Sequence, residues 1–353
     1  MPLTTSKRFI VLPLLIYMLA AAAPASASGN AALSESSGVT AQRPAESSGV
    51  TAQRPAVEIV RECEPSVVAV VGKLSKLSRD YSDMSSNIVH GSGIVYKSNG
   101  YIVTNHHVVD GCEKLFVVLS DKRIYEARVV GADEASDIAL IKIEKGMLNP
   151  VVFADSAAVE TGAPVITIGT PVSFDLYNSV GVGVISGIDR YSVFTEYYCL
   201  QTDATANQGN SGGPIIDMEG RTLGIIAVKY ADFSNITLCI TSHTIQYIVP
   251  QLLRYGRVRR PDPGGKPEQS LMADFGLSGN QGLYITEITE DGPMAEAGVT
   301  GDDMLLAINS SYLSTYLDYT EELKNYAPGD TVELTLRRGN NIRTVQITFA
   351  EKE

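Results

Sequence analysis

A serine lies between glycines in residues 209–214, which read Gly-Asn-Ser-Gly-Gly-Pro. Attack on a peptide carbonyl needs a nucleophile, a base, a group that orients the base, and donors for the developing oxyanion. Glycines on both sides let the backbone turn tightly and point N–H groups at an oxygen beside the Ser211 hydroxyl. We therefore predict Ser211 as a nucleophile. We predict Gly209, Asn210 and Ser211 as an oxyanion hole in which the amides of Gly209 and Ser211 donate.

Four histidines are candidates for the base: His90, His106, His107 and His243. His106 and His107 are adjacent at the end of a predicted strand, where successive side chains point in opposite directions. One of the two can therefore face the site and the other cannot, and spacing alone leaves the choice open. We expect His90 to lie in a loop. We expect His243, just before a predicted helix, to be structural or exposed.

Asp137 directly precedes the apolar sequence Ile-Ala-Leu-Ile-Lys-Ile. An acid at the start of such a strand is partly buried and can accept the N–H of an imidazole. The nearest competitor is Asp133, which we expect in a turn-like, solvated stretch. The combination of Ser, His and Asp predicts acyl transfer.

Runs of β-branched and apolar residues, broken by Gly, Asn and Asp, fill residues 57 to 253. About a dozen such runs with almost no helical periodicity predict an all-β barrel or sandwich unit. One helical segment near 245–255 closes it. Residues 257–269 are rich in Pro, Gly and charge and read as a linker. A smaller unit follows, with predicted strands in GLYITEI and TVELTLRR and predicted helices in PMAEAG and YLDYTEELKNY.

The N-terminal residues read as an export signal: Lys7 and Arg8, an apolar run over 9–23, and Ala-Ser-Ala before a cleavage point after Ala27. The alternative is an uncleaved anchor, but about 15 apolar residues interrupted by Pro13 fall short of the ~20 that span a bilayer. We expect residues 1–27 to be removed and the remainder to be exported, in a periplasmic, secreted or membrane-tethered form.

An 11-residue sequence, ESSGVTAQRPA, occurs at 35–45 and again at 46–56. Two such units without large apolar residues cannot build a core, so we predict that 28–56 is a flexible linker. The formal net charge of −12 argues against nucleic acid or an anionic membrane surface as a partner.

Four cysteines lie far apart without C-x-x-C spacing, which supports neither a zinc site nor a redox motif. They are Cys63, Cys112, Cys199 and Cys239. One or two disulfides are possible in an exporting compartment, and Cys199 with Cys239 is compatible because both lie in predicted strands of one barrel. Four buried free thiols are equally compatible.

Several blocks across 57–250 together resemble the HtrA family of proteases: GSGIVYKSNGYIVTNHHVV, SDIALIKI, IGTP with GVGVISGI, and LQTDATANQGNSGGPIID. The resemblance places the catalytic His directly before Val-Val, which selects His107, the Asp before Ile-Ala-Leu, which is Asp137, and the Ser in Gly-Asn-Ser-Gly-Gly, which is Ser211. It implies a mainly β fold, a chymotrypsin-like pair of six-stranded barrels with the site between them, over residues 57–254.

The sequence PMAEAGVTGDDMLLAIN resembles the PDZ domains of the same family. The resemblance implies a small α+β PDZ domain over 270–353, joined by a linker at 255–269. In such domains a loop of amides captures a C-terminal carboxylate while the peptide adds a strand to the sheet. Phe275, Gly276 and Leu277 take the matching place, although the family loop more often shows an aromatic residue, a hydrophobic residue and then Gly.

The resemblance implies an extracytoplasmic serine endopeptidase that hydrolyses unfolded or misfolded proteins through an acyl-enzyme and is targeted by its PDZ domain. It implies no metal or organic cofactor, unfolded polypeptides and protein C-termini as partners, and a homotrimer or larger assembly. The alternative is a chaperone-like peptide-binding scaffold with little proteolysis.

Small uncharged residues before Ser211 include Thr205 and Ala206, which we predict to line the primary pocket. They predict cleavage after small or branched aliphatic residues. A rival reading takes Ser211, Asp232 and His243 in α/β-hydrolase order, but that elbow needs a helix straight after the serine. Gly-Gly-Pro-Ile-Ile follows instead and predicts a turn and then a strand.

Overall fold

The computed structural model describes residues 54–74, 88–171, 174–192, 194–229, 235–274 and 282–352. The predicted export signal, and all but the last few residues of the predicted linker at 28–56, lie outside the described residues. Among the residues described, no helix is long and apolar enough to cross a membrane.

Six antiparallel strands rich in Val and Ile close into a first barrel, in the order β1-β2-β3-β6-β5-β4. These strands are β1 (Val67–Leu74), β2 (Ile88–Lys97), β3 (Tyr101–Thr104), β4 (Cys112–Val118), β5 (Ile124–Asp133) and β6 (Ile138–Ile143). Its core is a cluster of buried aliphatic side chains that includes Val68, Val95, Ile102, Val117 and Ile141.

A second closed barrel follows, in the order β10-β11-β12-β9-β8-β7. Its strands are β7 (Pro164–Gly169), β8 (Ser179–Ser192), β9 (Thr195–Thr202), β10 (Pro214–Ile216), β11 (Thr222–Lys229) and β12 (Thr237–Thr241). Val165, Ile185, Leu200 and Ile215 fill its interior. The predicted pair of six-stranded barrels is thus confirmed, and turns rather than helices connect most strands.

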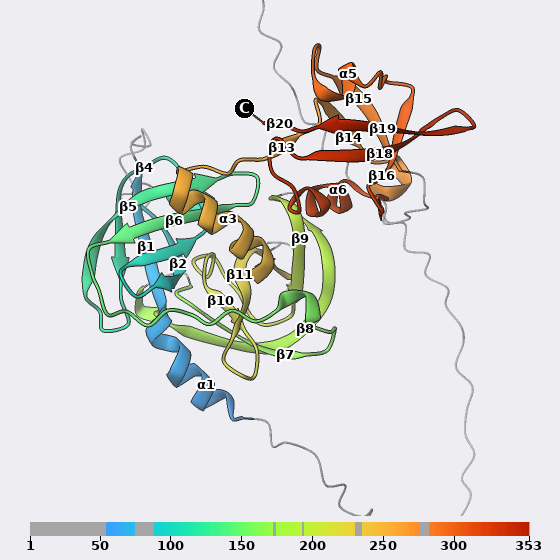
Figure 1. The fold of residues 1–353 in the computed structure, drawn as a ribbon. Coiled ribbons are helices and arrows are strands. Elements are labelled where there is room, and N and C mark those ends of the chain that lie inside the picture. The colour runs from blue at the N-terminus through green and yellow to red at the C-terminus, as the bar shows by residue number, and fades with distance from the viewer. Residues whose placement is uncertain are drawn as a thin grey trace, which may run out of the picture. The chain divides into compact units, whose positions relative to one another are not determined.

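Two helices pack on the barrels (Figure 1). Helix α1 (Ala56–Cys63), followed by the 3₁₀ turn η1 (Glu64–Ser66), buries Ile59 against β7. Helix α3 (Ser242–Tyr255) buries Ile248 and Leu252 in a cluster with side chains of both barrels. Because α3 contacts strands of both barrels, it fixes their relative placement. Short 3₁₀ turns occur at η3 (Ser156–Ala158) and η4 (Phe174–Leu176), and one helical turn, α2 (His106–Val109), follows β3.

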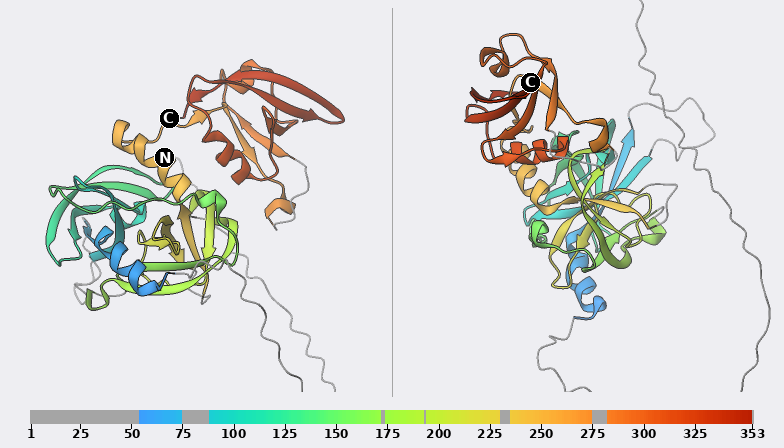
Figure 2. Two further views of the ribbon diagram at one scale, coloured as in Figure 1. Left: turned by 60° about the horizontal axis from the view of Figure 1, so that its bottom comes forward. Right: turned by 90° about the vertical axis from the view of Figure 1, so that its right-hand side faces the viewer.

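The C-terminal part forms a smaller sheet with the path β14-β15-β16-β18-β19, with β17 paired to β16 and a separate β13-β20 pair. Figure 2 shows this sheet with α6 packed on it. The elements are β13 (Pro261–Asp262), β14 (Gly265–Glu268), α4 (Leu271–Asp274), β15 (Leu283–Ile288), α5 (Pro293–Glu296), β16 (Asp303–Ile308), β17 (Ser311–Tyr312), α6 (Tyr316–Leu323), β18 (Thr331–Arg338), β19 (Asn341–Thr348) and β20 (Ala350–Glu351).

Part of the segment that the sequence predicts to be a linker is therefore folded. Strands β13 and β14 arise from the Pro- and Gly-rich sequence PDPGGKPE, and β14 lies at an edge of the sheet. Edge strands tolerate proline because the missing N–H need not join a ladder on both sides.

All four cysteines are free thiols. In the pairing of β9 with β12, Cys199 lies opposite Ile240. Directly opposite residues share a face of the sheet, so Cys239, one residue away, points to the other face. The register of the strands therefore separates the two thiols that the sequence left as a possible pair.

Candidate active site

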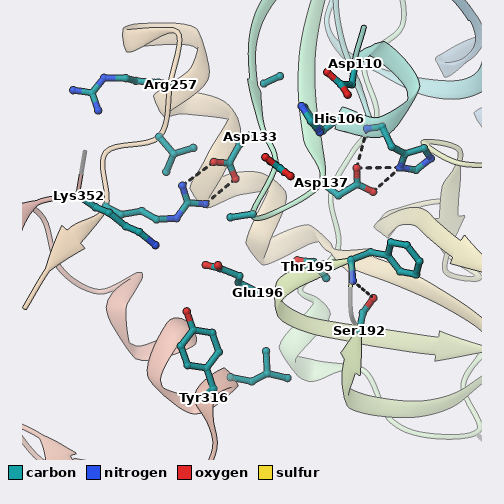
Figure 3. Close-up of a pocket in the computed structure, with 18 of the residues that line it drawn as sticks. His106, Asp110, Asp133, Asp137, Ser192, Thr195, Glu196, Arg257, Tyr316 and Lys352 are labelled. Atoms are coloured by element: carbon teal, nitrogen blue, oxygen red, sulfur yellow. Dashed lines mark hydrogen bonds and ion pairs between the residues drawn. The ribbon is translucent and has the colours of Figure 1, made fainter. Parts of the chain in front are cut away.

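His107 and Asp137 are in direct contact (Figure 3). The imidazole Nδ1 lies 2.8 Å from Asp137 Oδ2 and 3.0 Å from Oδ1, and the His107 amide donates to Oδ1 at 3.0 Å. The Asp137 side chain is 8% exposed, whereas that of His107 is 48% exposed. A buried carboxylate thus holds Nδ1 while the rest of the ring remains accessible to a substrate.

His106 and His107 have different surroundings, and the alternation of side chains along a strand does not explain the difference. Both histidines belong to α2, not to the end of β3, so successive side chains are separated by about a quarter turn of a helix. The His106 backbone amide and the Asn105 side-chain amide each donate to the Asp137 carbonyl, at 3.1 and 3.0 Å. These two bonds fix the backbone of Asp137, and only His107 meets its carboxylate.

Asp137 has a left-handed backbone with φ of 53°. Its amide closes a turn on the carbonyl of Glu134 at 3.0 Å. This conformation costs most residues about 1–2 kcal/mol, but Asp and Asn adopt it more readily. The turn delivers the carboxylate to the histidine just before β6 begins.

Asp133, expected to be solvated, is buried. Its two oxygens accept hydrogen bonds from Arg260 Nη1 and Nη2, both at 2.7 Å, and one of them also accepts from the amide of Ser136 at 3.0 Å. Burial alone would raise the pKa of Asp133, but the bonds and charge of Arg260 and Ser136 lower it. The expectation was wrong because a distant arginine covers this turn, and Asp133 does not compete for the histidine. Figure 3 shows this ion pair beside Asp137.

Ser211 lies in the tight loop before β10. Gly209 and Gly212, on either side of it, have φ of 98° and 86°, which glycine adopts at little cost. The Ser211 Oγ donates to the carbonyl of Ala227 at 3.3 Å, and among the described residues no hydrogen bond joins it to His107. In this rotamer the Ser211 hydroxyl is directed to the carbonyl of Ala227.

The amides of this loop differ in availability. The amide of Asn210 donates to the carbonyl of Asn207 at 2.9 Å. The amides of Gly209 and Ser211 find no acceptor within the parts of the chain that the structure describes. Those two are free to stabilise an oxyanion, and Asn210 contributes the turn that presents them.

Ser92, which the sequence reasoning missed, joins this loop to the first barrel. Its amide donates to the Ser211 carbonyl at 2.7 Å, and its hydroxyl donates to the Gly209 carbonyl at 2.8 Å and accepts from the Thr170 amide at 3.0 Å. Ser92 is fully buried. The signal was the sequence Gly-Ser-Gly inside a predicted strand, since glycine in a strand often marks a close backbone approach.

His90 also meets this loop. It lies in β2, not in a loop as expected, and a Cβ built on Gly209 would come within 2.5 Å of its Nε2. Burial lowers the pKa of His90. His243 lies in the first turn of α3, and its Nε2 is 3.0 Å from Asp155 Oδ1.

The sequence is similar to two protein-family models and to several known proteases. Residues 91–225 match the model of the trypsin-like peptidase domain, and residues 260–349 match that of the PDZ domain. The serine protease Do-like HtrA of Bacillus subtilis is 32% identical over 326 residues, which cover 84% of this chain and 73% of that protein. The chain belongs to the HtrA family of serine proteases.

A probable periplasmic serine protease do/HhoA-like of Haemophilus influenzae is 33% identical over 270 residues, and the match spans 57% of its length. The solved structure of the serine endoprotease from Yersinia pestis has a TM-score of 0.65 at 29% identity, over 84% of this chain and 98% of that one. The HtrA-type protease AlgW with decapeptide has a TM-score of 0.70 at 24% identity, over 84% and 98%, and is similar in fold.

In this HtrA-family chain, the two residues predicted to line the primary pocket face different ways. Thr205 is exposed, whereas Ala206 is buried in the core of the second barrel. The nearby Asp203 uses one carboxylate oxygen to accept the amide of Val184 at 2.7 Å. Phe275, Gly276 and Leu277, predicted for the PDZ loop, lie outside the described residues.

A cavity of about 380 Å³ is bordered by β14 and α6 and, on the side of the second barrel, by Glu196 and Tyr197 of β9 and Tyr247 of α3. Its lining includes Gly265, Lys266 and Pro267 from β14 and Tyr316, Tyr319 and Leu323 from α6. No group of three His, Cys, Asp or Glu side chains that could hold a metal ion occurs among the residues described.

Proposed function

We propose that this protease is an extracytoplasmic endopeptidase that hydrolyses unfolded or misfolded proteins with His107, Asp137 and Ser211 as its triad. The observation that carries the proposal is the contact of His107 Nδ1 with the buried Asp137 carboxylate at 2.8 Å. A hydroxyl on a glycine-flanked loop, bound to the first barrel through Ser92, completes the set.

In the proposed reaction, Ser211 Oγ attacks the substrate carbonyl while its proton passes to His107 Nε2. Asp137 holds the Nδ1 proton and stabilises the imidazolium, and the amides of Gly209 and Ser211 bind the oxyanion. The C–N bond then breaks as His107 returns the proton to the leaving amine. Water, deprotonated by His107, attacks the acyl-enzyme, the ester C–O bond to Ser211 breaks, and His107 returns the proton to Ser211 Oγ as the acid leaves.

The pocket proposal is cleavage after small or branched aliphatic residues. Thr205 and Ala206 bring no acid to the segment before the nucleophile, and the Asp203 carboxylate already holds a backbone amide. A peptide library in which basic residues are preferred before the cleaved bond would contradict this assignment.

The relatives named periplasmic support the proposal of an extracytoplasmic location. Removal of residues 1–27 stays a prediction, which the N-terminal sequence of the mature protein tests. The homotrimer or larger assembly implied by the family is likewise a proposal, and light scattering of the mature protein measures it.

The decisive experiment measures cleavage of unfolded β-casein, and of a stably folded protein as a control, by the unmodified chain and by Ser211→Ala, His107→Ala and His106→Ala. We expect loss of cleavage in the first two variants and its retention in His106→Ala, because His106 contacts Asp137 through its backbone amide, which alanine keeps, and not through its side chain. Activity that survives Ser211→Ala would identify a different nucleophile. Binding of β-casein without cleavage by the unmodified chain would favour the chaperone-like alternative.

A further inference from the structure

The edge strand β14 and helix α6 border a cavity whose remaining wall includes Glu196 and Tyr197 of β9. Among the described residues, β14 pairs with β15 and ends the sheet, so its outer backbone is the place where an extended peptide could add as a strand. The side chain of Gln269, just after β14, accepts from the amide of Tyr316 at the start of α6 at 3.0 Å. This bond keeps the strand and the helix in register along the cavity.

A peptide that adds antiparallel to β14 has its C-terminus beside the loop before β14, so the amides of that loop would meet its carboxylate. This loop differs from the predicted one at 275–277, which lies outside the described residues. Two of the four residues from Pro261 to Gly264 are prolines, which have no N–H. Asp262 pairs with Ala350 in the β13-β20 ladder. Few backbone donors therefore remain in this loop for a ligand.

The amide of Gly264 is already occupied by an anion from within the chain. It donates to Asp262 Oδ1 at 2.8 Å. Gly264 itself is left-handed, with φ of 75°, and packs closely on Pro293. The side chain of Asp262 thus gives this amide the negatively charged acceptor that a peptide carboxylate would otherwise supply.

The basic side chains around the cavity are largely committed to acids. Arg260 forms the two bonds to Asp133 described above. The Nζ of Lys266 lies 2.9 Å from Glu268 Oε1 and 3.9 Å from Glu287 Oε1. Lys352, which is exposed, also lines the cavity. Glu287 and Asp262 add negative charge to the same lining, and like charges disfavour an incoming carboxylate.

We propose that the groove between β14 and α6 binds internal extended segments of a polypeptide and does not use a free C-terminal carboxylate as its anchor, because Asp262 already caps the loop. The proposal narrows the partner of the PDZ unit and rests on its proposed role in binding polypeptides. Apolar and aromatic side chains seated against Tyr316, Tyr319 and Leu323 supply the affinity instead.

The test uses the full chain with Ser211→Ala, which prevents cleavage. Fluorescein-labelled decapeptides that span β-casein are made in two forms, with a free C-terminal carboxylate and with a C-terminal amide. We expect the two forms of each binding peptide to have Kd values within about threefold of one another, or the amide to bind tighter. Leu323→Lys, at the groove, should weaken both forms at least about tenfold.

Asp262→Ala should create the carboxylate preference that the native chain lacks. With the Gly264 amide released and one negative charge removed, the acid form should gain at least about tenfold over the amide form. Glu287→Gln is the matched control, since it removes one charge from the same cavity and leaves Asp262 on Gly264. It should favour the acid form over the amide form by less than about threefold, because the charge of Glu287 is exposed and the Gly264 amide stays occupied. Asp262→Asn, a near-isosteric change, replaces the alanine variant in this test if that variant unfolds. It should raise the preference for the acid form over the amide form by a smaller factor.

Acid peptides that bind the native chain at least about tenfold tighter than their amides would overturn the inference and leave the binding role of the PDZ unit intact. Binding that is insensitive to Leu323→Lys would place the peptides outside the groove and overturn it too. Absence of binding by every peptide to every variant would overturn both the inference and the proposed PDZ role.

Discussion

Asp137 meets two demands at once. Its carboxylate must accept the His107 N–H, and its backbone must hold a φ of 53°. Among the twenty side chains, only Asp and Asn combine a short polar group at this distance with tolerance of the left-handed region. A substitution at this position can therefore remove the carboxylate and still keep the backbone conformation.

Asp137→Asn should keep the fold and lose the activity. We expect a Tm within about 3 °C of the native value, because Asn tolerates the backbone, and a fall in kcat/KM of about 10⁴-fold, because the amide favours the wrong histidine tautomer. Asp137→Ala should lose similar activity and about 1 kcal/mol more stability. Thermal unfolding and β-casein cleavage measure both. An Asn variant with more than about one hundredth of native activity would remove Asp137 from the triad.

Ser92→Ala should damage stability and catalysis together. The change leaves the carbonyl of Gly209 and the amide of Thr170 buried without their partner, at a cost of about 1–3 kcal/mol. Because the loop then moves relative to His107, kcat should fall more than KM rises. Urea unfolding and steady-state kinetics measure the two effects. Ser179→Ala, which removes one exposed bond to the Leu176 carbonyl, should change neither by more than about 0.5 kcal/mol.

At this scale, sequence reasoning could identify the nucleophile motif and the two candidate histidines. It could not choose between His106 and His107 from spacing, because a one-turn helix replaces the expected strand end. Ser92 escaped because it meets Gly209 across 117 positions of chain, and only the closed barrels bring them together. Long-range contacts of this kind leave no periodic trace in the sequence.

Among the elements, the turn between β5 and β6 depends on an arginine that lies far along the chain. Arg260 holds Asp133 through two bonds, Asp133 holds Ser136, and Asp137 follows directly. A planar guanidinium matches a carboxylate in this bidentate way, and an ammonium does not. Arg260 is thus a structural support of the turn that carries Asp137, the proposed third member of the triad.

Arg260→Met should destabilise the protein by about 3–5 kcal/mol, because it leaves the Asp133 carboxylate buried and unpaired. Arg260→Lys should lose less, because one charge remains. The double variant Arg260→Met with Asp133→Asn should recover part of the loss, since the orphaned charge is gone. Urea unfolding of the native chain, Arg260→Met, Asp133→Asn and the double variant measures the coupling, with Arg260→Lys compared separately. Equal and additive losses would show that the pair does not support the turn.

Strands were predicted correctly where runs of β-branched residues are long. They were missed where the local composition is typical of a linker. Both barrels follow from such runs in 57–253, together with the family resemblance. Strands β13 and β14 were missed because their Pro, Gly and charged residues are typical of linkers. Their strand geometry comes from pairing with β20 and β15, which the local sequence does not encode.

For the whole molecule, buried acids paired with arginine set the response to pH. Burial alone would raise the pKa of Asp303, but bonds from Arg338, Arg343 and the Thr300 amide lower it to about 2. A carboxyl group with a lowered pKa in the folded state stabilises the fold above the pKa of the unfolded chain. That contribution is lost as pH falls through the folded pKa. Asp133 acts in the same direction.

Stability should therefore fall as pH drops from about 4 to about 2, the range set by the ordinary and shifted pKa of Asp303. Asp303→Asn should be less stable than the native chain at pH 7, and the difference should shrink across this range. Urea unfolding at pH 7, 4, 3 and 2 checks the trend. A difference that stays constant with pH would mean that Asp303 does not titrate as proposed.

The division of the proposed site between the barrels also bears on when activity can arise during synthesis. The ribosome makes the first barrel first, with His107 on α2 and Asp137 in the turn before β6, and a growing chain that stops before residue 209 has neither Ser211 nor the amides beside it. The first barrel also presents Ser92 to a loop that does not yet exist. With Ser211 as the proposed nucleophile, hydrolysis requires the last part of the second barrel, and an incomplete chain should not cleave other proteins. The order of these residues along the chain therefore delays the proposed activity until the second barrel has been synthesised.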